Sequence, residues 1–123
     1  MSTQKGPEPF YSTARRAGDL LFLSGFGPVD NDHNVVGADI EAQTVYTMDA
    51  MKAALAREGA KWNDAVRVNV FLLNMEDRDR FNATYMRYFD GGPMPTRRLI
   101  GAGDMYKGIL VEIDCIAYLG KDK

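Results

Sequence analysis

The sequence predicts an α+β domain in which one mixed β-sheet is covered on one face by two helices. Two segments carry apolar residues at the three- and four-residue spacing of a helix, and at least four others have the composition or alternation of strands. Their order along the chain, strand–strand–helix–strand–helix–strand–strand, is typical of a two-layer sandwich. Since 123 residues are the length of one domain, we expect residues 1–123 to form a single unit.

The N-terminal part predicts a β-hairpin. Residues 1–9 are rich in glycine and proline and are expected to be an extended lead-in. The strand-like runs 11–17 and 20–24 flank a Gly-Asp turn, which is the pattern of a hairpin. The two valines at 35–36 follow a polar turn and are candidates for a short edge strand.

A first helix is expected from Asp39, which can cap its N-terminus, to about Glu58, with Gly59 as its stop. Trp62, just past this helix, is expected to fill the core. The apolar stripe of the helix steps by four, three and four residues through Thr44, Met48, Met51 and Leu55.

The middle of the chain predicts a strand and a second helix. Residues 65–73 alternate, so one face of the strand should consist of Val66, Val68, Val70 and Leu72. Asn74 is expected to cap the second helix, whose apolar stripe is Phe81, Tyr85, Tyr88 and Phe89. A Gly-Pro-rich break at 91–95 precedes two final strands, at about 96–102 and 109–119.

The last strand separates two kinds of side chain. The face suited to the helices consists of Ile109, Val111, Ile113, Cys115 and Ala117. The other face places two carboxylates, Glu112 and Asp114, between Leu110, Ile116 and Tyr118. Solvent-facing surfaces rarely carry so much apolar area, which favours an oligomer with this face at or near the contact, scattered exposed apolar residues being the alternative.

Composition excludes several classes of protein. No apolar run approaches ~18 residues, so no transmembrane helix is expected. The N-terminus lacks the hydrophobic core of a secretory signal, so we expect a cytoplasmic protein. The single Cys115 allows neither an internal disulfide nor a cysteine metal cluster, and the single His33 argues against a histidine-built metal site. A net charge of −2 argues against a nucleic-acid binder.

Arg97, Arg98 and Glu112 are the charged residues best suited to chemistry. Since side chains alternate across a sheet, only one of the two arginines can face a given neighbour, and an arginine fork can hold a carboxylate by two parallel hydrogen bonds. The alternative is a solvated pair of charges. Glu112 is a candidate general base or water-binding group, or else half of an interface salt bridge. If strands 96–102 and 109–119 pair as a hairpin, contact between Arg97 and Glu112 requires a neighbouring subunit or a bend.

Other polar residues give weaker signals. Tyr11 can donate a phenolic proton, although strand tyrosines usually serve packing. Ser24 and Gly25 can present a hydroxyl and backbone N–H groups to an anion, or simply end a strand. Asn82 lies on a helix, where asparagine is most often exposed, and His33 lies in a polar loop and is expected to face solvent.

Short motifs over about residues 10–119 resemble, in order, those of the RidA family, also called YjgF. The interval between the family's arginine and glutamate is kept without a gap between Arg97 and Glu112. The motifs are Tyr11-Ser-Thr-Ala14, Leu20-Leu-Phe-Leu-Ser-Gly25 with Gly27-Pro-Val29, Phe81-Asn-Ala-Thr-Tyr85 with Tyr88-Phe89, Pro95-Thr-Arg97 and Val111-Glu-Ile-Asp-Cys-Ile-Ala117.

This resemblance implies a chorismate-mutase-like sandwich and a homotrimer with active sites between subunits. It also implies hydrolysis of 2-imino acids, of the 2-iminopropanoate and 2-iminobutanoate type, to 2-oxo acids and ammonia. By position, Arg97 would hold the substrate carboxylate, Glu112 would hold the attacking water, and Arg98 would be a spectator. The cleft would be completed by Tyr11, Ser24, Gly25 and Asn82. No metal or organic cofactor is implied, because a protonated imine is already electrophilic.

The chain departs from the family pattern in three places. Arg98 and Leu99 replace a small residue and a cysteine, Met105 and Tyr106 replace Leu-Pro, and Phe26 replaces a short polar residue. These bulkier residues are expected near the cleft, where they would change the substrate more than the fold. The alternatives left open are a deaminase of a 2-aminomuconate-type enamine and a non-catalytic small-carboxylate binder or regulator.

Overall fold

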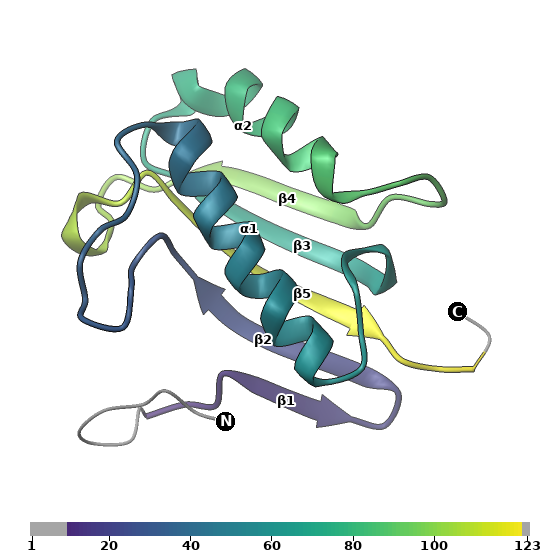
Figure 1. The fold of residues 1–123 in the computed structure, drawn as a ribbon. Coiled ribbons are helices and arrows are strands. Elements are labelled where there is room, and N and C mark those ends of the chain that lie inside the picture. The colour runs from purple at the N-terminus through teal and green to yellow at the C-terminus, as the bar shows by residue number, and fades with distance from the viewer. Residues whose placement is uncertain (1–9, 122–123) are drawn as a thin grey trace.

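A computed structural model describes residues 10–121 and shows a five-stranded sheet with both α-helices on one face (Figure 1). This confirms the predicted α+β sandwich, while the lead-in expected at residues 1–9 lies outside the described residues. The strands are β1 (Ala14–Ala17), β2 (Leu20–Phe26), β3 (Ala65–Leu72), β4 (Thr96–Gly101) and β5 (Val111–Tyr118), and the helices are α1 (Ile40–Arg57) and α2 (Arg78–Tyr85). Short 3₁₀ turns occupy Trp62–Asp64, Met75–Asp77, Met86–Tyr88 and Tyr106–Gly108.

The strands lie in the order β1-β2-β5-β3-β4, with β3 and β4 parallel and all other neighbours antiparallel. The β1–β2 hairpin is confirmed, and the valine pair contributes a single bridge, Val29 to Val35. The hairpin considered for 96–102 and 109–119 is wrong, because β3 lies between β4 and β5. The connection through α2 carries the chain back over the sheet, so β4 joins β3 in parallel at the sheet edge (Figure 1).

Helix α1 begins and ends at the predicted residues. The Asp39 carboxylate accepts a hydrogen bond of 2.9 Å from the Ala42 N–H, and this bond, together with Arg80, lowers the pKa of Asp39. Gly59 has a φ of +82° just past the last turn, a conformation that only glycine adopts without cost. No helix within residues 10–121 is long and apolar enough to cross a membrane.

The second helix begins later than predicted. Asn74 makes no capping hydrogen bond, and the chain forms the turn Met75–Asp77 before α2 starts at Arg78. The predicted stripe is confirmed at Phe81 and Tyr85, which are buried against the core.

The core lies between the sheet and the helices. The predicted inner face of β5 is confirmed, and Trp62 fills the core, where its indole N–H donates to the Met48 carbonyl oxygen at 3.2 Å. Val66, predicted to share one face of the strand with Val68, Val70 and Leu72, is 43% exposed, whereas those three are fully buried. An irregularity in the β3–β5 register between Ala65 and Arg67 turns Ala65 inward instead.

The opposite face of the sheet is uncovered in the single chain. Glu112, Asp114, Ile116 and Tyr118 of β5 lie half-buried on it, and Phe22 of β2 is exposed beside them. The Asn69 side-chain amide donates to the Asp114 carboxylate at 2.7 Å, which satisfies one of its acceptors. The predicted division of β5 into a core face and a mixed polar–apolar face is therefore confirmed.

Candidate functional site

Arg97 lies on the helix side of the edge strand β4. It pairs in register with Val68, whose side chain is fully buried in the core, so both point toward the helices. The Arg97 guanidinium carbon lies 5.0 Å from the ring centroid of Tyr85 and 5.9 Å from that of Phe81, both on α2. These cation–π contacts hold the half-buried guanidinium against α2 with a defined orientation.

A cavity of about 340 Å³ opens beside Arg97. Two of its polar atoms, Asn82 Oδ1 and the Tyr85 hydroxyl, are buried without a hydrogen-bond partner in the described part of the chain. Burial raises the pKa of Tyr85 to about 12, so its hydroxyl keeps its proton at neutral pH. Since buried polar groups normally find partners, this cavity is suited to a polar ligand. Its remaining lining comes from Met86, Met94 and Pro95.

Glu112 lies near the start of β5 on the uncovered face of the sheet, opposite Phe71 of β3. Burial, and secondarily the neighbouring charge of Asp114, raise the pKa of Glu112. Its carboxylate rests against Gly25, where any side chain would overlap Glu112 Oε2. A carboxylate that is easier to protonate than usual is better suited to accepting a proton from water than an ordinary carboxylate.

Glu112 lines a second cavity, of about 460 Å³, together with two of the other predicted residues. Gly25 forms part of the wall, and Tyr11, which is 64% exposed and precedes β1, stands at the side. Ser24 is not among the described residues that line either cavity. Its hydroxyl instead donates to the Ser12 carbonyl oxygen at 2.5 Å, which fixes the backbone just before Gly25.

The predicted site residues thus form two groups on opposite faces of one sheet. Arg97 and Asn82 face the cavity under α2, and Tyr11, Gly25 and Glu112 face the cavity on the other side. Because the sheet itself separates the two faces, one chain does not bring Arg97 and Glu112 together. Each group is half of the constellation expected from the sequence.

One cavity residue was missed by the sequence reasoning. His33, expected to face solvent, lines the cavity of Glu112, and so does Tyr106, which was expected near the cleft as a departure from the family pattern. The His33 side chain is exposed as expected, but its loop places it at the cavity rim. The signal available in the sequence was the turn composition around Asp30, which predicts a fixed loop without saying where it docks.

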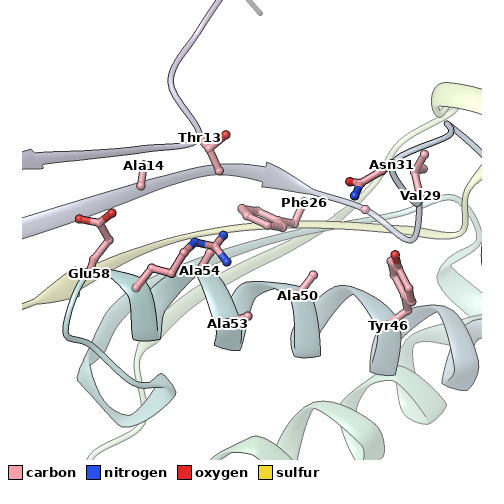
Figure 2. Close-up of a pocket in the computed structure, with 12 residues that line it drawn as sticks. Thr13, Ala14, Phe26, Val29, Asn31, Tyr46, Ala50, Ala53, Ala54 and Glu58 are labelled. Carbon is pink, nitrogen blue, oxygen red and sulfur yellow. The ribbon is translucent and has the colours of Figure 1, made fainter. Parts of the chain in front are cut away.

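A larger cavity, of about 670 Å³, lies elsewhere, between α1 and the β1–β2 hairpin. Figure 2 shows the Phe26 ring in the space between the strands and α1, on the same side of the sheet as Ala50, Ala53 and Ala54. The expectation that Phe26 crowds the cleft with Glu112 is therefore wrong, because the register shift between Leu23 and Phe26 interrupts the alternation of β2 and turns Phe26 to the helix side. Neither Arg97 nor Glu112 lines this cavity.

Comparisons with known proteins match nearly the whole chain. The family model described as endoribonuclease L-PSP matches residues 3–119. A RutC family protein of Saccharolobus solfataricus is 38% identical over 94% of this chain and 93% of its own length. A 2-iminobutanoate/2-iminopropanoate deaminase of Dermatophagoides farinae is 31% identical over 97% of this chain and 94% of its own. The crystal structure of E. coli TdcF with bound serine superposes with a TM-score of 0.84, at 26% identity, over 94% of this chain and 92% of that chain.

Proposed function

Because the chain belongs to the endoribonuclease L-PSP family, the YjgF/RidA family, we propose that it hydrolyses small 2-imino acids to 2-oxo acids and ammonia. The observation that carries the proposal is Arg97, oriented by two aromatic rings at a cavity with unpaired buried polar atoms. Among the relatives, one is named for this reaction and another holds serine, an amino acid with the carboxylate that a 2-imino acid also has.

In the proposed reaction Arg97 holds the substrate carboxylate through two parallel hydrogen bonds. Glu112 accepts a proton from a water molecule, whose oxygen forms a bond to the imine carbon and gives a tetrahedral carbinolamine. The protonated nitrogen then leaves as ammonia when the carbon–nitrogen bond breaks, and the hydroxyl proton returns to a base as the 2-oxo acid forms. In this proposal Tyr11, which lines the same cavity, passes a proton to the departing nitrogen. Orientation supplies most of the catalysis, because a protonated imine is already electrophilic.

We propose further that the complete site forms between subunits of a homotrimer. The two groups of residues lie on opposite faces of the sheet, so a site with both needs two chains. The uncovered face, with Phe22, Ile116 and Tyr118 beside Glu112, is the surface for such an assembly. In a cyclic assembly each interface then joins Arg97 of one chain to Glu112 of the next.

The reaction is tested by generating an imine with an amino-acid oxidase in the presence of semicarbazide. An active protein slows the formation of the semicarbazone by removing the imine first. A folded protein that gives no protection, for either small or bulky imines, would contradict the proposal.

The shared site is tested by mixing two inactive variants. Arg97→Ala chains keep Glu112, and Glu112→Gln chains keep Arg97, so co-refolding them in equal amounts should restore about a quarter of the wild-type sites. The two variants refolded separately and then combined without exchange are the control. If co-refolding restores no activity although the chains mix, as shown by mass spectrometry of the assemblies, then the site lies within one chain.

One observation also favours a second function, that of a small-carboxylate binder without turnover. The E. coli relative was crystallised with serine, which has no imine to hydrolyse. This function predicts that the protein binds serine or pyruvate in calorimetry, that Arg97→Ala abolishes the binding, and that no imine is consumed.

A further inference from the structure

Two loops at the rim of the Glu112 cavity hold residues in an unusual backbone conformation. Among residues 10–121, His33 (φ 65°) and Lys107 (φ 53°) are the non-glycine residues with positive φ. A left-handed conformation costs a residue with a Cβ about 1–2 kcal/mol, so it persists where surrounding contacts determine it. Because both residues lie in the loops at one cavity, we take the backbone conformation of this rim to be fixed by specific contacts.

The first loop is fixed by its own hydrogen bonds. The Asp30 carboxylate accepts from the N–H groups of Asp32 and Asn34, both at 2.9 Å, and the His33 N–H donates to the Asp30 carbonyl oxygen at 3.0 Å. These bonds close the turn and hold the His33 ring at the cavity.

Lys107 joins this loop to the second one. Its ammonium donates to the His33 carbonyl oxygen and lies 5.7 Å from the ring centroid of Tyr106. Tyr106, which is 56% exposed, is thereby held beside the same cavity as His33. Lys107 therefore connects the loop of His33 to the loop of Tyr106.

The side chains around this cavity suit a flat, uncharged group. Three residues with aromatic side chains, Tyr11, His33 and Tyr106, line it together with the apolar Val29 and Ile109. The Ile109 side chain packs against Gly27, where an added Cβ would lie 2.9 Å from its terminal methyl carbon, so this part of the wall is apolar. Of the described residues that line the cavity none is Lys or Arg, and the Lys107 ammonium at the rim already donates to the His33 carbonyl oxygen, so a second anionic group would meet the Glu112 carboxylate without a free cation to pair with.

We infer that His33 and Tyr106 form a subsite for the substrate side chain and that it selects 2-imino acids with an aromatic side chain. The inference rests on the proposed function, because it needs the imine carbon to sit at Glu112. It differs from the 2-aminomuconate-type alternative, whose extra carboxylate this cavity disfavours. At about 460 Å³, the cavity has the volume for a phenyl or indole group.

Competition between imines tests the inference. Imines of phenylalanine, alanine and glutamate are generated by matching amino-acid oxidases, and kcat/KM is measured for each by protection from semicarbazide. We expect the phenylalanine imine to be preferred over the alanine imine by about tenfold, and the glutamate imine to be the poorest substrate.

Variants at the rim should change this preference. Tyr106→Ala and His33→Asn should each lower the ratio of kcat/KM for the phenylalanine imine to that for the alanine imine by about fivefold, because each removes a ring. Asparagine tolerates the left-handed backbone at position 33, so that loop should keep its shape. Tyr106→Phe keeps the ring and should keep the ratio, which separates stacking from the hydroxyl.

The outcomes distinguish this inference from the proposed function. Turnover of all three imines without an aromatic preference, or an unchanged ratio in both ring-removing variants, overturns the subsite alone. If no imine is consumed, the proposed function fails, and calorimetry with the 2-oxo acids decides on the subsite. Phenylpyruvate should then bind about tenfold more tightly than pyruvate, and equal affinities would overturn the subsite as well.

Discussion

Arg97→Lys is expected to lower kcat/KM for imine hydrolysis by about a hundredfold, and Arg97→Ala by about a thousandfold. Lysine keeps the positive charge but loses the planar fork that makes two parallel hydrogen bonds to a carboxylate. It also loses the flat face that packs on the Tyr85 ring at 5.0 Å, so the remaining ammonium is less well oriented. The loss should appear in kcat and KM together, because the carboxylate contact both binds and orients the substrate.

The neighbouring arginine supplies the matched control. Arg98 differs from Arg97 by one position, and alternation along β4 turns it to the opposite side of the sheet. Arg98→Lys should therefore keep kcat/KM within about twofold, with an unchanged oligomeric state by light scattering. Equal losses of kcat/KM in Arg97→Lys and Arg98→Lys would mean that the paired hydrogen bonds proposed for Arg97 have no special part in the reaction.

The Arg97–Arg98 pair also shows where sequence reasoning succeeds and where it stops. Alternation correctly required the two arginines to face opposite sides, but the side of each depends on which strand β4 joins. The sequence left open whether this strand pairs with the last one, and in the structure β4 lies beside β3 in parallel. The separation of Arg97 from Glu112 by the sheet follows from that long-range choice.

Two smaller differences between the sequence predictions and the structure also depend on contacts between segments that are distant in the sequence. The spacing of Val66 predicts that it shares the face of Val68, but the irregular β3–β5 register turns it outward. A shift of one residue exchanges the two faces of a strand. The sequence around His33 predicts an ordinary loop residue. Its position at the cavity depends on the contact of its loop with Lys107, which lies far away in the sequence. By contrast, the cap at Asp39 and the alternation of β5 are local signals, and both were predicted correctly.

Glu112→Gln is expected to abolish imine hydrolysis, by about a thousandfold in kcat, and at the same time to make the protein more stable at pH 7. Glutamine has the same shape beside Gly25 but cannot accept a proton from water. Burial raises the pKa of Glu112, so the folded protein binds this proton more tightly than the unfolded chain does. The ionised carboxylate therefore costs stability at neutral pH. The cost disappears as pH falls through the raised pKa, so the gain in Tm should be larger at pH 7 than at pH 4.

The pH dependence of the wild type follows from the same shift. Activity needs the ionised Glu112, so kcat should fall on the acid side at a pH above the usual carboxyl range. Asp114→Asn should move this limb to lower pH while keeping the reaction, because it removes a negative charge that raises the pKa of Glu112. Asparagine can still accept the hydrogen bond from Asn69 that Asp114 accepts at 2.7 Å. If Glu112→Gln is inactive but no more stable, and the acid limb stays in place in Asp114→Asn, then Glu112 serves to position water and the base is another group.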